Sequence, residues 1–324
     1  MTTTTQRLMA GVGSPPLRAL RSVLHFFKQM AQRPLAFTGM IIVAIFLILA
    51  VIGPDVAPYR YDQIIRGTDI GIDDRRAQKS LPPSETFVMG TDQRGRDIFS
   101  RMLWGARDTI GLPLIATLIA VIIGNAVGLA VGYLGGWVDE VVSRAMDSLL
   151  SIPALVLALV MISTIVPVMS ESDIPLVQSI GATNISLTIV IVLLYVPIVT
   201  RVVRSATLNV RTSGYIEAAK LRGETTLYIM FREIFPSVLP ALVVEASLRL
   251  SYAIFLVASL GFLGLGVQPP TPEWGRMVLD ARPRFTTEPW EMWFPVLGIA
   301  ILITSVNLMS DGLRRIFRND QERE

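Results

Sequence analysis

The sequence contains no cysteine and a single histidine, His25. The lack of cysteine excludes disulfide bonds and thiolate metal sites. A histidine-based metal site or a Ser/His catalytic arrangement would need that histidine near the apolar part of the chain, but it lies close to the N-terminus. We therefore expect this chain to hold no metal and no cofactor, and to carry out no covalent chemistry.

No stretch matches the nucleotide-binding loop G-x-x-x-x-G-K-[ST]. If the chain takes part in a process driven by ATP, a separate polypeptide must bind and hydrolyse the nucleotide. The chain also shows no internal repeat and no second domain. The inverted repeats that many secondary transporters carry are therefore missing.

Charged residues are scarce, at 17% of 324 residues, whereas 52% are hydrophobic. A helix needs about 20 apolar residues to cross a hydrocarbon layer about 30 Å thick. Unpaired backbone groups are costly in lipid, so long charge-free stretches are expected to cross as helices. The sequence predicts an all-α membrane protein with six such crossings, at 34–54, 109–138, 148–170, 174–200, 250–272 and 292–310.

The distribution of basic residues predicts the orientation. The leader, residues 1–34, carries five basic residues and no acidic ones, which places the N-terminus in the cytoplasm. Six crossings bring the C-terminal tail, 313–324, to the same side. The first apolar stretch exceeds the core of a typical signal peptide, so we expect it to be retained. The net charge of +3 fits membrane orientation better than nucleic-acid binding.

Three segments lie between the leader and the tail. The first transmembrane helix is expected at 35–57 and an external loop at 58–108. A core of five transmembrane helices follows at 109–312, interrupted by a cytoplasmic segment at 212–236. Within the external loop, Ile98, Phe99, Met102 and Leu103 recur at helical spacing. This pattern predicts a short helix on the outer surface of the membrane.

The cytoplasmic segment at 212–236 predicts two helices joined by a glycine turn, which we call the elbow. Ser213 suits a helix N-cap, and Glu217 falls in the first turn, where a carboxylate favours the helix dipole. Gly223 stands where the first helix would end in a left-handed residue. A second short helix would run to Pro236. Periodicity alone leaves two interpretations open: a face for close docking of a partner protein, or a hairpin resting on lipid headgroups.

The second crossing contains a stripe of glycines, Gly124, Gly128 and Gly132, spaced four residues apart. Such spacing lets two helices approach closely. Asn125 lies beside the stripe and is expected to line either a helix contact or a pore.

Crossing five extends backward through two charged residues, Glu245 and Arg249. Their i,i+4 spacing allows an ion pair within one helix. The pair either neutralises itself inside the bundle or forms a polar wall of a translocation path. Arg144 and Asp147 could form a second local pair, although anchoring at the membrane surface is the default interpretation for them.

The elbow resembles a known signature. Glu217-Ala218-Ala219, three residues, Gly223, ten residues and then Ile234-x-Pro236 is similar to the cytoplasmic motif of permease subunits of bacterial ABC importers. The family usually has leucine where this chain has Phe235. The resemblance implies that these residues form a coupling elbow, which fits a cleft on an ATPase subunit and transmits its closure: Glu217, Ala218, Ala219, Gly223, Ile234 and Pro236.

Two further stretches resemble the C-type permeases of dipeptide, oligopeptide and nickel importers. One runs from Gly90 to Arg101, and the other from Phe262 to Pro270, with Trp274-Gly275 following. The likeness covers roughly residues 30 to 318. The chain departs from the family pattern at two positions, Phe87 in place of histidine and Val257 in place of glutamate. Substrate details are therefore not transferred.

The resemblance implies a heterodimer with a homologous permease, two ATPase subunits that bind ATP and Mg, and an external solute-binding protein. Di- or oligopeptides are the expected cargo, by family frequency, and nickel-chelate or other small-solute import remains an alternative. Two other classes stay open: a secondary transporter or channel without ATPase partners, and a membrane-embedded enzyme. The enzyme would require a buried cluster of acids, bases or metal ligands, which the sequence does not show.

Overall fold

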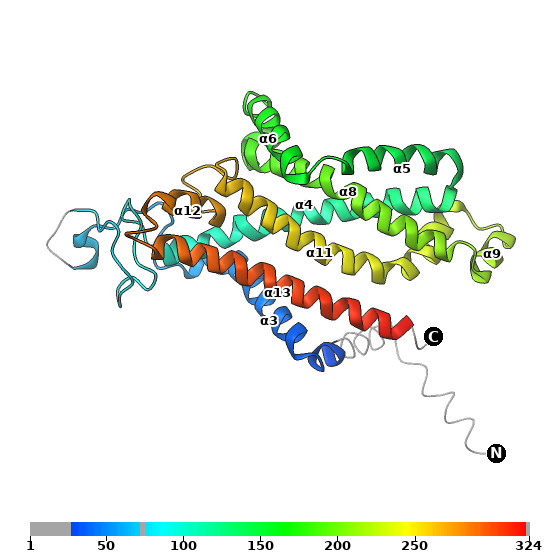
Figure 1. The fold of residues 1–324 in the computed structure, drawn as a ribbon, viewed down its shortest axis with the longest axis horizontal. Coiled ribbons are helices and arrows are strands. Elements are labelled where there is room, and N and C mark those ends of the chain that lie inside the picture. Colours follow the sequence, from blue (N-terminus) through cyan, green and yellow to red (C-terminus); the bar gives the residue numbers. More distant parts are fainter. Residues whose placement is uncertain (1–26, 72–75, 322–324) are drawn as a thin grey trace, which may run out of the picture.

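A computed structural model describes residues 27–71 and 76–321. Most of the predicted leader, including His25, and the end of the predicted tail lie outside these residues. The described chain forms an elongated bundle of long helices (Figure 1). Two isolated β-bridges are its only extended pairings within the described part. The prediction of an all-α fold is confirmed.

Five helical stretches are long and apolar enough to cross a membrane, and a pair of helices bent by 87° makes a sixth if it is one span. Three of the five are single helices, α3 (Pro34–Val56), α4 (Ile98–Leu134) and α8 (Ala182–Val210). A fourth is α13 (Trp290–Gln321). The bent pair is α5 (Gly136–Leu150) and α6 (Ala154–Ser170).

The fifth long stretch, Thr226–Phe262, joins three helical segments without a gap. These are α10 (Thr226–Tyr228), the π-helix η2 (Ile229–Ile234) and α11 (Phe235–Phe262). Short helices complete the described fold: α7 (Pro175–Ile180), α9 (Gly214–Leu221), α12 (Trp274–Ala281), and the 3-10 turns η1 (Gly67–Ile70) and η3 (Arg282–Arg284).

The short surface helix predicted near residue 98 does not exist as a separate element. Ile98 begins α4, which runs unbroken through the predicted second crossing. Asp97 caps this helix, because its carboxylate accepts hydrogen bonds from the Ser100 backbone N–H at 2.7 Å and hydroxyl at 2.6 Å. Ile98 and Met102 are buried, and the Trp274 indole donates to the Met102 carbonyl at 3.0 Å. The apolar stripe therefore faces α12 rather than lipid headgroups.

Two predicted crossings are interrupted. The stretch 148–170 starts inside α5 and turns sharply before α6, where Pro153 is the N-cap. Proline lacks an N–H and disfavours helical geometry in the residue before it, so the helix must restart there. The stretch 174–200 is divided at Gly181, whose φ of +93° ends α7 before α8 begins.

The contact between α4 and α8 is the most extensive in the described bundle. The predicted glycine stripe creates it, because a Cβ at any of the three positions would come within 2.7 Å of an α8 side chain. These pairs are Gly124 with Val199, Gly128 with Val203 and Gly132 with Thr207. The predicted close approach of two helices is confirmed.

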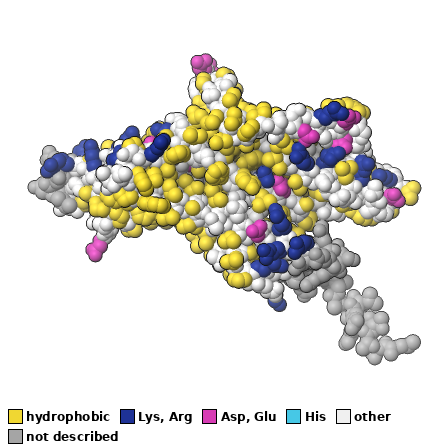
Figure 2. Space-filling model, viewed as in Figure 1, with side chains coloured by type: hydrophobic (Ala, Val, Ile, Leu, Met, Phe, Trp, Pro, Cys, Tyr) yellow, Lys and Arg dark blue, Asp and Glu magenta, His cyan; other side chains and the backbone are white. Residues whose placement is uncertain are grey.

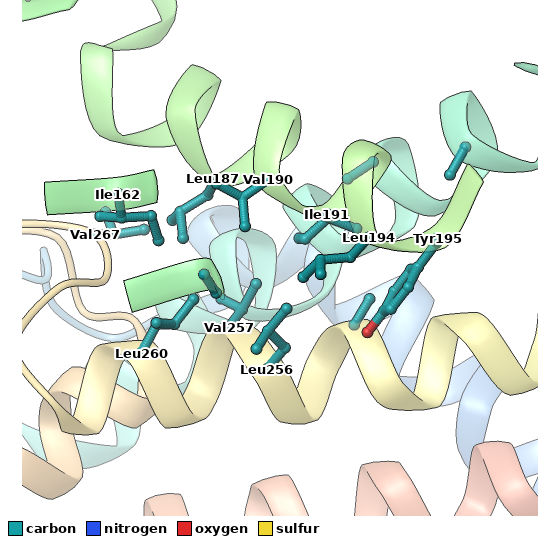
Figure 3. Packing of buried hydrophobic residues seen from close by; sticks show 14 residues of the cluster. Ile162, Leu187, Val190, Ile191, Leu194, Tyr195, Leu256, Val257, Leu260 and Val267 are labelled. Atoms are coloured by element: carbon teal, nitrogen blue, oxygen red, sulfur yellow. The ribbon is translucent and has the colours of Figure 1, made fainter. Parts of the chain in front are cut away.

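A buried apolar cluster holds α6, α8 and α11 together (Figure 3). Ile162 comes from α6, Leu187 and Ile191 from α8, and Val257 from α11, and all are almost fully buried. Tyr195 lies at one end of this cluster and reaches from α8 toward α11. The packing therefore fixes the position of α11, which carries the charged pair Glu245 and Arg249.

Candidate functional site

The elbow projects from one end of the bundle, where α9 is the outermost helix (Figure 1). Gly223 follows α9 with a φ of +78°, and a Cβ there would meet no atom within 4 Å. The predicted left-handed glycine is confirmed. Ser213 is the N-cap residue, but its hydroxyl donates to the Val210 carbonyl at 2.6 Å instead of capping α9.

The two alanines of the motif lie on different sides of α9. Ala219 is fully buried together with Ile216, and both pack against Ile229 and Ile234 of η2. Glu217 and Ala218 are exposed. Only the outer side of α9 is therefore accessible to a partner. The small side chain of Ala219 lets the inner side of α9 pack closely on η2.

The second helix of the elbow does not end at Pro236, contrary to the prediction. Ile234 is buried in η2, and Pro236 occupies the first turn of α11. Because proline has no N–H, the preceding turn cannot keep the usual hydrogen-bond register. It widens into a π-helix, in which the Phe235 N–H donates to the Met230 carbonyl. The elbow is thus continuous with crossing five.

Polar contacts fix the two arms of the elbow to each other and to the bundle. Arg222 forms ion pairs with Glu224 at 3.6 Å and with Glu233 at 3.3 Å, across the glycine turn. The Lys220 ammonium lies 5.6 Å from the centre of the Tyr133 ring on α4. These contacts tie α9 to η2 and to the end of α4.

The tip of the elbow exposes large apolar side chains. Leu221 is 90% exposed and Leu227 66% exposed, and Phe231 is also exposed. Charged side chains of both signs surround the elbow, whereas the middle of the molecule is mostly apolar (Figure 2). Isolated apolar residues on a charged surface of this kind suit a protein contact.

The charged pair on α11 is formed as predicted. Arg249 Nε and Glu245 Oε1 are 2.7 Å apart, and both side chains are largely buried. The Arg249 guanidinium lies 4.9 Å from the centre of the Tyr252 ring and 5.7 Å from that of Tyr195. The possible pair between Arg144 and Asp147 is not formed: Arg144 binds Glu140, and Asp147 binds Arg201 of α8.

Asn125 does not join the charged pair. It is buried on α4, beside the contact in which the Thr200 hydroxyl donates to the Gly124 carbonyl at 3.3 Å. Its side-chain oxygen has no hydrogen-bond partner, and no hydrogen bond or ion pair links it to Glu245 or Arg249 among the described residues. The position favours a helix contact over a pore lining.

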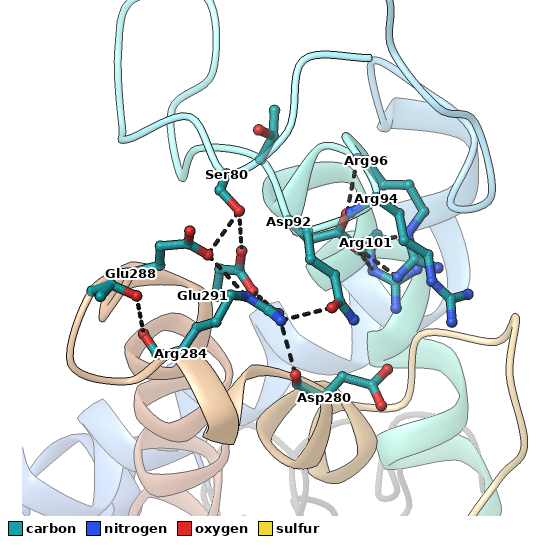
Figure 4. Close-up of polar contacts among 12 residues, drawn as sticks. Ser80, Asp92, Arg94, Arg96, Arg101, Asp280, Arg284, Glu288 and Glu291 are labelled. Atoms are coloured by element: carbon teal, nitrogen blue, oxygen red, sulfur yellow. Dashed lines mark hydrogen bonds and ion pairs between the residues drawn. The ribbon is translucent and has the colours of Figure 1, made fainter. Parts of the chain in front are cut away.

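Sequence reasoning missed a polar network at the opposite end of the bundle, which we call the outer network (Figure 4). Arg96 Nε donates to Asp92 at 2.7 Å, and Arg101 lies 3.7 Å from the same carboxylate. Arg284 binds Gln93 at 2.6 Å and Glu291 at 2.8 Å. The network therefore ties the loop before α4 to η3 and α13.

Glu273 is the N-cap residue of α12, the helix that leads into η3. Its carboxylate is fully buried and accepts hydrogen bonds from the backbone N–H groups of Gly275 at 2.7 Å and Arg276 at 2.8 Å. Burial raises the pKa of Glu273 to about 7, although these hydrogen bonds oppose the shift. The only available sequence signal was the spacing of Glu273 before the α12 helix, which suits an N-cap.

Comparison with known sequences assigns the family. Residues 124–322 match the binding-protein-dependent transport system inner membrane component. The chain belongs to this family of transport permeases. Residues 24–83 match the N-terminal transmembrane domain of oligopeptide transport permease C. The permease is therefore a multi-pass inner-membrane subunit of an ABC importer, a family that works with ATPase and binding-protein partners.

Individual relatives cover most of the permease. The dipeptide transport system permease protein DppC of Escherichia coli strain K12 is 38% identical over 305 residues, 92% of each chain. The DppC protein of Alkalihalophilus pseudofirmus is 34% identical, covering 89% of this chain and 86% of the relative. The peptide transport system permease protein SapC of Salmonella typhimurium is 35% identical, covering 86% and 88%.

A solved structure shares the fold. The MetNI methionine ABC transporter in an inward-facing conformation matches with a TM-score of 0.51 at 23% identity. The match covers 67% of this permease and 95% of the other chain. The bundle is thus that of an ABC importer permease.

Proposed function

We propose that this permease carries di- or oligopeptides inward across the membrane and is driven by separate ATPase subunits docked at the elbow. The relatives named for dipeptide and peptide transport, which cover most of the chain, support the cargo. Nickel-chelate import is not favoured by any of these named relatives. A secondary transporter is not favoured either, because the family depends on a binding protein.

The proposed complex contains a homologous permease as second membrane subunit, two ATPase subunits and an external solute-binding protein. ATP and Mg are bound by the ATPase subunits, and this chain is non-catalytic. Both termini lie in the cytoplasm, on the side of the elbow. The five basic residues of the leader 1–34, which has no acidic residue, support this orientation.

The observation that carries the coupling role is the exposed outer side of α9 joined to a continuous helix. ATP-driven closure of the ATPase subunits moves α9, and the unbroken stretch Thr226–Phe262 carries that movement into the membrane. The inward-open and outward-open states are thereby biased against each other. Glu217, Ala218 and Leu221 form the contact, whereas Ala219, Ile234 and Pro236 support it from within.

The substitution Gly223→Leu tests the coupling role. A branched side chain in the left-handed conformation costs about 1–2 kcal/mol and tilts α9 away from its seat. We expect the complex to assemble but to lose the stimulation of ATP hydrolysis by peptide-loaded binding protein. Gly71→Leu is the matched control, because Gly71 has a φ of +79° and equally open surroundings far from the elbow.

A second variant tests the docking contact itself. Leu221→Asp places a charge in the centre of the exposed apolar tip, and we expect the ATPase subunits to co-purify at a reduced level. Normal peptide-stimulated hydrolysis in Gly223→Leu, together with normal co-purification in Leu221→Asp, would refute coupling through the elbow.

A further inference from the structure

The ion pair of Glu245 and Arg249 lies in the middle of a membrane-spanning helix. Arg249 is midway between Pro236 and Phe262, about 20 Å from each at 1.5 Å per residue. Lipid headgroups lie at the edges of the hydrocarbon layer, so neither charge is placed to meet one. Charged side chains at this depth face protein or water and mark pathways for polar solutes.

The pair leaves hydrogen-bonding capacity unused. Glu245 Oε1 and Arg249 Nε are 2.7 Å apart, yet both are buried atoms without a hydrogen-bond partner among the described residues. The two opposite charges attract each other, but the Nε–H group of Arg249 is not directed at the Glu245 carboxylate oxygen as a hydrogen bond requires. An unmade hydrogen bond in a low-dielectric site is costly, which favours a ligand that completes it.

Two tyrosines flank the ion pair, one of them buried and the other exposed. Tyr195 is nearly fully buried on α8, and its ring centre lies 5.7 Å from the Arg249 guanidinium. Tyr252 packs on the same guanidinium but is 55% exposed. Both rings stabilise the cation and hold its plane in position. The Tyr252 side is therefore the side from which a solute reaches the pair.

We propose that Glu245, Arg249, Tyr195 and Tyr252 form a transient binding site for the zwitterionic backbone of a peptide during its passage. Arg249 binds the C-terminal carboxylate and Glu245 the N-terminal ammonium group. This inference rests on the proposed function of peptide import. The site would bind the two charged ends of the peptide rather than its side chains.

The charge balance explains why a zwitterion suits this site. Separating Glu245 from Arg249 in a medium of low dielectric is expensive if either charge is left without a partner. A zwitterion supplies a new partner to each of them, so the number of ion pairs does not fall. A carboxylate also fits the planar fork of an arginine with two parallel hydrogen bonds. A peptide blocked at one end leaves one charge uncompensated.

The lack of native cysteine allows a direct test in the complete complex. Leu248 is half-buried one turn from Tyr252 and belongs to no part of the site. The variant Leu248→Cys, in complexes held in lipid nanodiscs, is reacted with a water-soluble thiol reagent. We expect dialanine to slow labelling at least threefold, and N-acetyl-dialanine or dialanine amide to have little effect. Thr86→Cys, exposed in the external loop, controls for direct effects of the peptides on the reagent.

Substitutions at the site complete the test. Adding Arg249→Gln should abolish protection by dialanine, and Arg249→Lys, which keeps the charge but not the fork, should weaken it. A Leu248→Cys thiol that is never labelled, protection that persists in Arg249→Gln, or equal protection by the blocked peptides overturns the proposal. ATP hydrolysis stimulated by loaded binding protein, measured on the same samples, shows separately whether the proposed function holds.

Discussion

Glu273 shows how a single buried carboxyl group can couple the fold to pH. The folded protein raises its pKa from the ordinary value of 4.5 to about 7, because burial penalises the charged form. The folded state therefore holds a proton that the unfolded state releases between these two values. Its contribution to stability is complete below about pH 4.5 and is lost as the pH rises through about 7.

We predict that Glu273→Gln flattens this dependence. In the original protein the ionisation of Glu273 should lower the free energy of unfolding by about 3 kcal/mol between pH 4.5 and 7.5. Thermal unfolding of the purified permease in detergent, followed across this range, measures the slope. Asp62→Asn, which changes an exposed carboxylate of the external loop, should leave the slope unchanged. A slope that Glu273→Gln does not alter would contradict the assignment.

The sequence predicts the conformation and partners of some residues correctly and of others wrongly. The left-handed Gly223 and the pair Glu245 with Arg249 follow from spacing within one helix, and the sequence predicts both. Ser213 and Asp147 were expected to bind other groups than they do: the Ser213 hydroxyl donates to the Val210 carbonyl, and Asp147 pairs with Arg201 of α8. A side chain with more than one partner within reach is not determined by sequence spacing alone.

At the scale of helices, the glycine stripe of α4 is the feature on which the bundle most depends. We predict that Gly128→Ala destabilises the permease by about 1–3 kcal/mol, because the new Cβ would lie 2.7 Å from Val203. Gly111→Ala on the same helix meets no atom within 4 Å and should be neutral or stabilising. Melting temperatures of the two variants decide the point, and equal values would argue against close α4–α8 packing.

Helix existence was predictable from apolar length, but helix ends were not. Ile98, Met102 and Leu103 have the spacing of an apolar helical face, which is the same whether the face meets lipid or α12. Sequence periodicity does not identify the covering partner, so the surface helix was predicted wrongly. Pro153 and Gly181 interrupt two predicted crossings, because proline and a glycine with positive φ end a helix even within an apolar stretch. The packing of neighbouring helices in the bundle then determines the angle between the two helices at each break.

At the scale of the whole molecule, the outer network determines whether the external loop stays docked. Arg284→Gln removes charge-assisted contacts with Glu291 and Glu288 at a cost of about 1.5–3 kcal/mol. We expect the population of undocked loop to rise about tenfold or more. Chymotrypsin cleavage at Phe87, which is buried in the docked loop, reports this change.

Arg60→Gln serves as the control, because Arg60 pairs with Asp62 at an exposed position in the same loop. It should leave the rate of cleavage at Phe87 nearly unchanged. Equal cleavage rates in the two variants would mean that the outer network does not hold the loop.

The length of α4 links the two ends of the molecule. This single helix is about 55 Å long at 1.5 Å per residue, with Arg101 in the outer network and Tyr133 against Lys220 of the elbow. The glycine stripe joins the inner third of this helix to α8, and Asp97 caps its outer end. We therefore expect a displacement of the elbow to be felt in the outer network through one continuous element.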